Sequence, residues 1–309
     1  MIGIENIGVY IPENREYNLN KSYDGMSVNE SFVRDKVGFI STARMGADEE
    51  TSDMCCKAFD DLKSRAENLS VSAVECICLC THNGDFQMPH TSAIIQDKLG
   101  LDAHCAAFDI GLACSGYVHA LNILQGFMEL NEFSTGIIFT CDPYSKVLNP
   151  NDKNADLLLG DAATATLLSS KGKFKMGRSV FHTKGKGHDA IIKRKDEFLY
   201  IDNRRVFNFV LREGAQTLRR CLKANDLTFD AIDLYLLHQA SEFVIKQLID
   251  MLKIPLDKAP FKAQEIGNTI SSSIPILLQD YLEDERLKTI LLCGFGAGMS
   301  AAATVLKRV

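Results

Sequence analysis

The 309-residue chain contains no tryptophan, only seven prolines and no long apolar run. None of its hydrophobic stretches approaches the ~18 residues that a membrane-spanning helix needs. The N-terminal stretch MIGIENIGVYIPEN also lacks the charged-then-apolar order of a signal peptide. We therefore expect a soluble, cytoplasmic protein that does not engage a membrane.

A basic excess is also missing, because 34 lysines and arginines face 40 aspartates and glutamates, for a formal net charge of −6. A surface that binds nucleic acid needs surplus cations to neutralise phosphates, so we expect no nucleic-acid partner. The rest of the composition, 46% hydrophobic and 24% charged, is typical of a globular chain with a sizeable core.

The ten cysteines form no pattern typical of metal binding or disulfides. Cys76, Cys78 and Cys80 alternate along an apolar run, so in a strand they face one way and do not converge on one ion. Without a secretion signal, a disulfide framework is not expected either. The scattered glycines form no dinucleotide-binding fingerprint, so we expect no metal, nicotinamide or flavin cofactor.

Three landmarks recur in the same order in the two halves of the chain. These are an apolar strand ending in polar residues, a strand-to-helix junction and a second apolar strand. They lie at 76–83, 106–123 and 136–143, and again at 234–241, 260–278 and 288–298. With helical patterns at 51–69 and 204–225, they predict an α/β fold of two pseudo-repeated halves, 1–168 and 169–309.

Three side chains suited to catalysis stand at the ends of these elements. Cys114 begins an amphipathic run, where a helix N-terminus would lower the pKa of a thiol, although a small core residue is the alternative. His238 ends a strand, where ligand sites gather in α/β folds, but an isolated histidine is more often a satisfied core residue. Asn268 begins the matching helix of the second half and would also serve as an N-cap.

A pseudo-twofold axis between the halves would bring Cys114, His238 and Asn268 to one point. The glycine-rich segment GFGAG at 294–298 would let a backbone N–H approach a developing oxyanion there. The simpler interpretation of that segment is a flexible turn.

Several segments together resemble the ketoacyl-acyl carrier protein synthase III family of the thiolase superfamily. They are IGVYIPEN, AFDIGLACSGYVHAL, NPNDKNADLLLGDAATA, LLHQAS, IGNTISSSIP and GFGAGMSAA, and the resemblance covers nearly the whole chain. It implies a five-layered αβαβα fold, a homodimer, and decarboxylative condensation of an acyl thioester with a malonyl thioester. The substrates would be thioesters of coenzyme A or acyl carrier protein, with no further cofactor.

The same resemblance implies a role for each candidate site residue. Cys114 would be the nucleophile that takes an acyl group from its carrier. His238 and Asn268 would hydrogen-bond the malonyl thioester carbonyl and stabilise the enolate formed as carbon dioxide leaves. The backbone N–H groups of Cys114 and Ala297 would form the oxyanion hole, and Met88 would cap the acyl tunnel of the neighbouring subunit.

At the entrance the chain departs from the family pattern. A tryptophan and an arginine that sandwich the adenine of coenzyme A in typical members are Phe32 and Lys153 here. Lys36 replaces another arginine, and Phe243 replaces an arginine that helps dock acyl carrier protein. Because lysine does not reproduce the stacking or the planar fork of arginine, we expect a divergent member in a specialised pathway rather than acetyl-CoA-primed initiation.

Three alternatives to a condensing enzyme remain open. An acyltransferase of the same fold would pass the acyl group from Cys114 to an alcohol or amine, although simple transfer needs no enolate stabilisation by Asn268. HMG-CoA synthase needs a carboxylate base near the nucleophile, and CTHNGDFQMPH supplies only Asp85. A silent partner subunit of a heterodimeric synthase would not need the Cys, His and Asn together.

Overall fold

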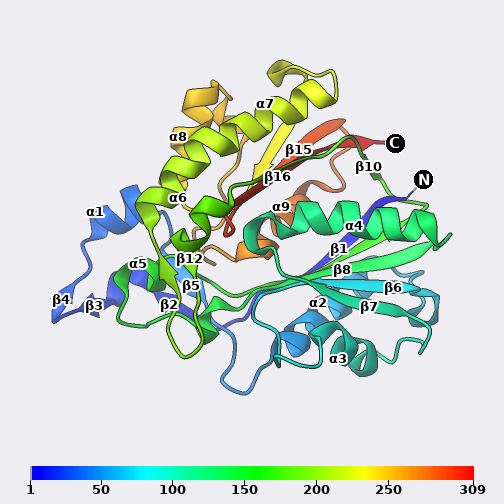
Figure 1. The fold of residues 1–309 in the computed structure, drawn as a ribbon, viewed down its shortest axis with the longest axis horizontal. Helices are drawn as coiled ribbons and strands as arrows, with labels where there is room; N and C mark the ends of the chain where they lie inside the picture. The colour runs from blue at the N-terminus through cyan, green and yellow to red at the C-terminus, as the bar shows by residue number, and fades with distance from the viewer. Residues whose placement is uncertain (1) are drawn as a thin grey trace.

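The computed structural model describes residues 2–309 and is built around a ten-stranded mixed sheet (Figure 1). The strand order is β14-β15-β16-β10-β1-β9-β8-β6-β7, and β11 pairs with β16. These strands are β1 (Gly3–Tyr10), β6 (Cys76–Cys80), β7 (Ala106–Ile110), β8 (Thr135–Cys141), β9 (Ala163–Ser169), β10 (Phe174–Met176), β11 (Val180–Thr183), β14 (Leu234–Leu237), β15 (Thr289–Gly296) and β16 (Ser300–Arg308).

The two halves of the sheet form two layers, with helices between them and on both outer faces. The helices are α1 (Glu30–Phe32), α2 (Thr51–Arg65), α3 (Thr91–Lys98), α4 (Gly116–Leu130), α5 (Lys153–Asp156), α6 (Asn203–Phe209), α7 (Ala215–Ala224), α8 (Glu242–Leu252) and α9 (Ser273–Tyr281). Three two-stranded sheets pair β2 (Arg15–Tyr17) with β5 (Ser41–Ala43), β3 (Ser22–Tyr23) with β4 (Met26–Ser27), and β12 (Ile191–Ile192) with β13 (Tyr200–Ile201).

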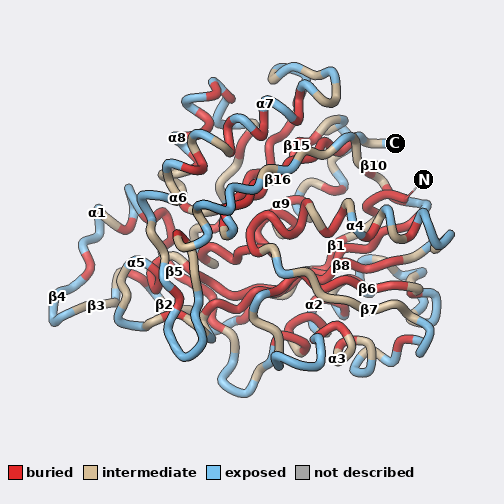
Figure 2. The backbone as a smooth tube through the Cα atoms, in the orientation of Figure 1, coloured by how far each residue is buried: buried red, intermediate tan, exposed pale blue. Residues whose placement is uncertain are grey.

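Alternation along the strands explains the layers. In β14, Leu234 and Leu236 belong to the core formed with α4 and α9, whereas Tyr235 and Leu237 belong to the core under α7 and α8. A third core packs α2 and α3 against β6, β8 and β9. Figure 1 shows the resulting stack, with α7 and α8 at the top, α4 and α9 in the middle, and α2 and α3 at the bottom. The predicted five-layered αβαβα fold is confirmed, and Figure 2 shows that its central strands are buried.

The strand pairings repeat in the two halves, as the sequence predicts. In the first half β6 runs parallel to β8, β8 antiparallel to β9, and β9 antiparallel to β1. In the second half β14 runs parallel to β15, β15 antiparallel to β16, and β16 antiparallel to β10. The fold therefore contains the two pseudo-repeated units.

One detail of the repeat differs from the prediction. The turn η4 (Ala113–Ser115) leads into α4, and the turn η10 (Ile270–Ser272) leads into α9. Each turn begins on a residue with positive φ, 42° at Ala113 and 53° at Ile270. Ser271, rather than Asn268, therefore stands where Cys114 stands, and Asn268 lies in the extended segment before the turn. Such backbone strain in residues that carry a Cβ is typical of functional sites.

All ten cysteines are free thiols, and the three strand cysteines of β6 are buried as apolar residues. Within residues 2–309, none of the helices is both long and apolar enough to cross a membrane.

Candidate active site

Cys114 lies where the two halves of the fold meet. It sits in η4, directly before α4, and strand β15 of the second half passes against it. A Cβ on Gly294 would collide with the Cys114 carbonyl oxygen, and one on Gly296 would lie 3.0 Å from the Cys114 sulfur. Only glycine permits this approach, so the second half forms part of the wall around the sulfur.

The thiol of Cys114 is held in its neutral form. The residue is 7% exposed, and burial raises the pKa of its thiol, with a further contribution from the charge of Asp142. The low pKa expected from a helix N-terminus is therefore wrong for this structure, because desolvation outweighs the favourable backbone N–H of Cys114 itself. A base must take the proton when the sulfur reacts.

His238 directly follows β14 and is buried. Its ring lies edge-on to Phe295 of β15, the strand that passes against Cys114. Its Nδ1 is 2.7 Å from the Ser273 Oγ, which in turn is 3.0 Å from the Ile270 carbonyl oxygen. A hydroxyl can accept from Nδ1–H while donating to the carbonyl, or donate to Nδ1 instead. Ser273 thus serves either tautomer, and Nε2 can accept a proton or donate one.

Burial also lowers the pKa of His238 to about 3, so the imidazole is neutral near pH 7. The unfolded chain takes up a proton at this residue below about pH 6.5, and the folded chain does not until about pH 3. Folding stability is therefore lost at this residue as the pH falls from about 6.5 towards 3, and is unaffected above that range.

We expect this loss to reach about 1.4 kcal/mol per pH unit in the free energy of unfolding. Urea unfolding at several pH values between 7 and 4.5 would measure it as the difference between wild type and His238→Asn. The comparison is needed because burial raises the pKa of Asp142 to about 6, which acts in the opposite direction. Identical pH dependence in the two proteins would contradict a buried neutral His238.

The backbone N–H and carbonyl of Asn268 are both hydrogen-bonded to the segment 158–160. Its N–H donates to the Leu158 carbonyl (2.7 Å), and its carbonyl accepts from the Gly160 N–H (3.0 Å). The side-chain Oδ1 accepts from the Ile270 N–H at 2.9 Å. Because this contact occupies the oxygen, the amide presents Nδ2, which within residues 2–309 makes no hydrogen bond, to the site. Asn268 is thereby fixed as a donor.

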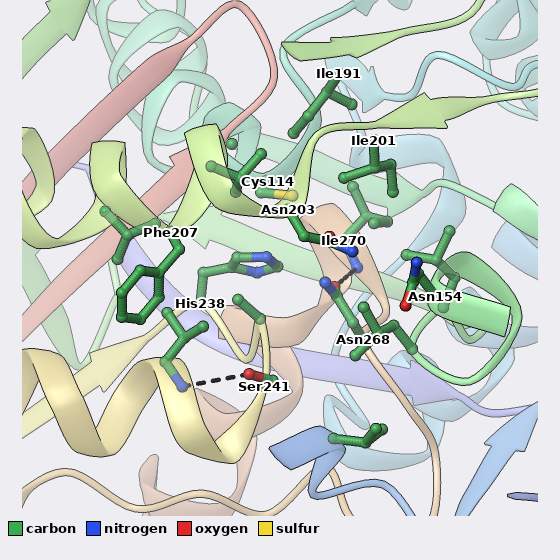
Figure 3. Close-up of a pocket in the computed structure, with 18 of the residues that line it drawn as sticks. Cys114, Asn154, Ile191, Ile201, Asn203, Phe207, His238, Ser241, Asn268 and Ile270 are labelled. Atoms are coloured by element: carbon green, nitrogen blue, oxygen red, sulfur yellow. Dashed lines mark hydrogen bonds between the residues drawn. The ribbon is translucent and has the colours of Figure 1, made fainter. Parts of the chain in front are cut away.

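Cys114, His238 and Asn268 line one cavity of about 390 Å³. Figure 3 shows the sulfur, the imidazole ring and the amide nitrogen facing the same space from three different elements. The walls are mainly aliphatic and aromatic, including Leu159, Leu199 and other apolar side chains of the central cluster. The arrangement places one nucleophile, one proton carrier and one fixed donor around an apolar chamber.

Two backbone N–H groups border the same chamber. Ala297 lies in the turn between β15 and β16 and lines the cavity with Cys114. In the described part of the chain, neither the Cys114 N–H nor the Ala297 N–H donates to another backbone group. Both lack a backbone partner there, and their role as an oxyanion hole stays a prediction.

The entrance residues reach the cavity but are already paired with one another. Phe32, Lys36, Lys153 and Phe243 all line it. The Lys153 Nζ lies 4.6 Å from the centroid of the Phe32 ring. The two residues expected to hold an adenine between them therefore contact each other in a cation–π pair. Lys36 lies over Phe243 at 4.5 Å, and Phe243 stacks on Phe207 at 5.7 Å. Met88, by contrast, does not line this cavity and is 85% exposed.

Three polar residues of the cavity are not predicted by any sequence motif. Asn154 in α5 and Asn203 at the start of α6 line the cavity, and Figure 3 shows Asn203 beside Cys114. Tyr144 lines it from η5 (Tyr144–Lys146). Asparagine and tyrosine are common in turns and cores, and no motif separates these residues from structural ones. Their only sequence signal is that each lies at the end of an element.

Two family models match the chain. That of 3-oxoacyl-[acyl-carrier-protein (ACP)] synthase III matches residues 108–185, and that of the C-terminal part of this enzyme matches residues 222–308. Together they cover more than half of the chain, including Cys114, His238 and Asn268. The chain belongs to the 3-oxoacyl-[acyl-carrier-protein] synthase III family.

Other members of the synthase III family match over nearly their full length. Beta-ketoacyl-[acyl-carrier-protein] synthase III 1 of Bacillus cereus is 28% identical, with 99% of this chain and 98% of that protein covered. The synthase III of Streptococcus mutans is 27% identical, with 91% and 92% covered.

Solved structures of the synthase III family agree with the fold. One 3-oxoacyl-(acyl-carrier-protein) synthase III superposes with a TM-score of 0.92 at 28% identity, covering 99% of both chains. The enzyme of Aquifex aeolicus VF5 gives 0.91 at 25% identity, covering 99% of this chain and 100% of that chain.

Proposed function

We propose that this chain is a cytoplasmic condensing enzyme that forms a β-ketoacyl thioester by decarboxylative Claisen condensation. A Cys114-bound acyl group would be the acceptor and a malonyl thioester the donor of two carbons. The observation that carries the proposal is the Asn268 amide, whose Nδ2 is fixed as a donor in the apolar chamber of Cys114. A simple acyltransferase has no need of that donor, whereas an enolate does.

In the first half-reaction, the Cys114 sulfur attacks the carbonyl carbon of the acyl thioester, and its proton passes to the His238 Nε2. The N–H groups of Cys114 and Ala297 stabilise the oxyanion. As the tetrahedral intermediate collapses, the bond to the carrier sulfur breaks, and the carrier thiolate takes the proton back from His238. The acyl group is then held as a thioester on Cys114.

In the second half-reaction, His238 is in the other neutral tautomer, reached by proton exchange with solvent, in which Nδ1 accepts from the Ser273 hydroxyl and Nε2 carries the proton. The Asn268 Nδ2–H and the His238 Nε2–H then hydrogen-bond the thioester carbonyl oxygen of malonate. The bond between the methylene carbon and the carboxylate carbon breaks, and carbon dioxide leaves. The electron pair of that bond stays on the thioester and forms an enolate, which the two donors stabilise. The enolate carbon attacks the acyl carbon on Cys114. The Cys114 thiolate departs and takes a proton from solvent, and the β-ketoacyl thioester is released.

Mass spectrometry of the intact protein tests the proposed function directly. Incubation with an acyl thioester is expected to add one acyl mass to the protein, and digestion should place it on the peptide containing Cys114. Addition of a malonyl thioester should then remove that mass and release a β-ketoacyl product. Absence of an adduct with any donor would refute the enzyme and favour a silent partner subunit. An adduct removed by alcohols or amines but not by malonyl thioesters would favour the acyltransferase.

The closed entrance predicts poor use of acetyl-CoA. Lys153 covers one face of Phe32, and its ammonium is a point charge where a guanidinium would lie flat against an adenine. We expect a kcat/KM for acetyl-CoA below roughly 10⁴ M⁻¹s⁻¹, with better loading from a longer or unusual acyl group on a cognate carrier protein. Lys153→Arg should raise the value for acetyl-CoA. A wild-type kcat/KM at or above that level would mean that the altered entrance is neutral.

The same departures support a specialised pathway and a carrier of its own. Phe243 stands where a basic residue would meet an acidic carrier protein, and it is instead packed between Lys36 and Phe207. An apolar contact at this point suits a dedicated carrier or partner protein.

A homodimer completes the proposed enzyme. Strand β7 forms one edge of the sheet and its residues are only partly buried, so its free edge is available to a second copy. Phe86 and Met88 protrude from the loop before α3, 65% and 85% exposed. We propose that Met88 caps the acyl tunnel of the neighbouring subunit.

A further inference from the structure

One polar group breaks the apolar lining next to the nucleophile. Tyr144 begins η5, is 6% exposed and lines the cavity. Its hydroxyl makes no hydrogen bond within residues 2–309. A hydroxyl without a protein partner in an otherwise apolar cavity wall is left to pair with water or with a polar group of a ligand.

Four other tyrosines, whose hydroxyls are hydrogen-bonded, show the contrast. The Tyr117 hydroxyl is 3.2 Å from the Thr166 Oγ1, and the Tyr235 hydroxyl donates to the Phe229 carbonyl at 2.6 Å. The remaining two are paired with charged side chains, Tyr10 with Lys57 at 3.1 Å and Tyr23 with Asp156 at 2.6 Å. Each of these hydroxyls is satisfied by the protein, and Tyr144 alone among them faces the cavity.

The position of Tyr144 assigns it to the acyl group rather than to the carrier arm. It packs in the cluster of Cys114, Leu148 and Leu159, whereas the entrance is formed by Phe32, Lys36 and their neighbours. Burial raises the pKa of the Tyr144 phenol, and the charge of Asp142 raises it further. It is therefore neutral at pH 7 and able both to donate and to accept.

We propose that Tyr144 selects a short acyl group that carries a hydroxyl, with which the phenol forms a hydrogen bond inside the otherwise apolar chamber. This inference rests on the proposed function, since it concerns the acyl group held on Cys114. An all-carbon chain would displace water from the phenol and leave it without a partner. A hydroxylated chain replaces that water, and the difference favours it by about tenfold in loading.

The test compares butanoyl thioesters that are unsubstituted or carry a hydroxyl on carbon 2, 3 or 4, all on the same carrier. The rate of adduct formation on Cys114 is followed by intact mass. At least one hydroxylated donor is expected to load the wild type about tenfold faster than butanoyl. Tyr144→Phe keeps the ring and removes only the hydroxyl, so the preference should disappear while butanoyl still loads.

Tyr235→Phe is the matched control, because it removes a buried hydroxyl bonded to a backbone carbonyl outside the cavity. It should retain the preference. Equal loading of all four donors by the wild type would overturn the role of Tyr144 and leave the proposed function intact. A uniform decrease for every donor in Tyr144→Phe would also overturn it, because the hydroxyl would then act on the sulfur. Failure of every donor to form an adduct would refute both proposals.

Discussion

Replacing Cys114 with alanine is expected to abolish acyl loading and to lower condensation by a factor on the order of 10⁵ or more. No other thiol can take over, because η4 is the only point where a sulfur meets both His238 and Asn268 in the described cavity. Intact-mass analysis after incubation with an acyl thioester, followed by product analysis with a malonyl thioester, measures both effects.

Cys105→Ala is the matched control for this variant, since Cys105 is a half-buried thiol outside the cavity. It should load like the wild type. Decarboxylation of the malonyl thioester by Cys114→Ala is expected to persist, because the donors to the enolate are His238 and Asn268. An acyl adduct on any other cysteine of Cys114→Ala would show that the nucleophile has been misassigned.

Replacing the enolate donors should separate the two half-reactions. Asn268→Ala is expected to lower condensation by about 10²–10³ and to spare loading, since its free Nδ2 serves only the malonyl carbonyl. His238→Ala should lower condensation by a similar factor and should also slow loading, because the His238 Nε2 takes the proton of the neutral Cys114 thiol. Single-turnover experiments that record adduct formation and adduct consumption separately would resolve the steps.

Asn122→Ala controls for the loss of an amide, because Asn122 bonds the Val118 carbonyl within α4, outside the cavity. It should leave both half-reactions unchanged. If Asn268→Ala lost loading and condensation in equal measure, its role as an enolate donor would be wrong. Unchanged loading in His238→Ala would show that another group takes the proton of Cys114.

The sequence alone determined the fold class and the repeat, because both follow from patterns local to each segment. The alternation in CICLC and the apolar LYLL predict buried strands, which are β6 and β14 in the structure. The switch to helical periodicity after Cys114 predicts α4. The residues at the ends of such elements could be singled out for the same reason.

Only the tertiary structure decided how the two halves are matched and how the sulfur is protonated. The positive φ values at Ala113 and Ile270 set the equivalence of Cys114 with Ser271, and neither residue type favours that conformation. The thiol pKa follows from burial beneath the second half, including the approach of Gly296. A local helix start predicts a lowered pKa because it contains no information about desolvation.

The chemistry of the chamber likewise depends on contacts between distant parts of the chain. The Lys153–Phe32 pair joins α5 to α1, and Tyr144 meets Cys114 from a different strand end. Residue types are sufficient to predict which side chains can react, because reactivity belongs to the groups themselves. Which groups are paired, desolvated or left facing a cavity is set by long-range packing, and in this protein that packing closes the entrance and leaves one phenol beside the nucleophile.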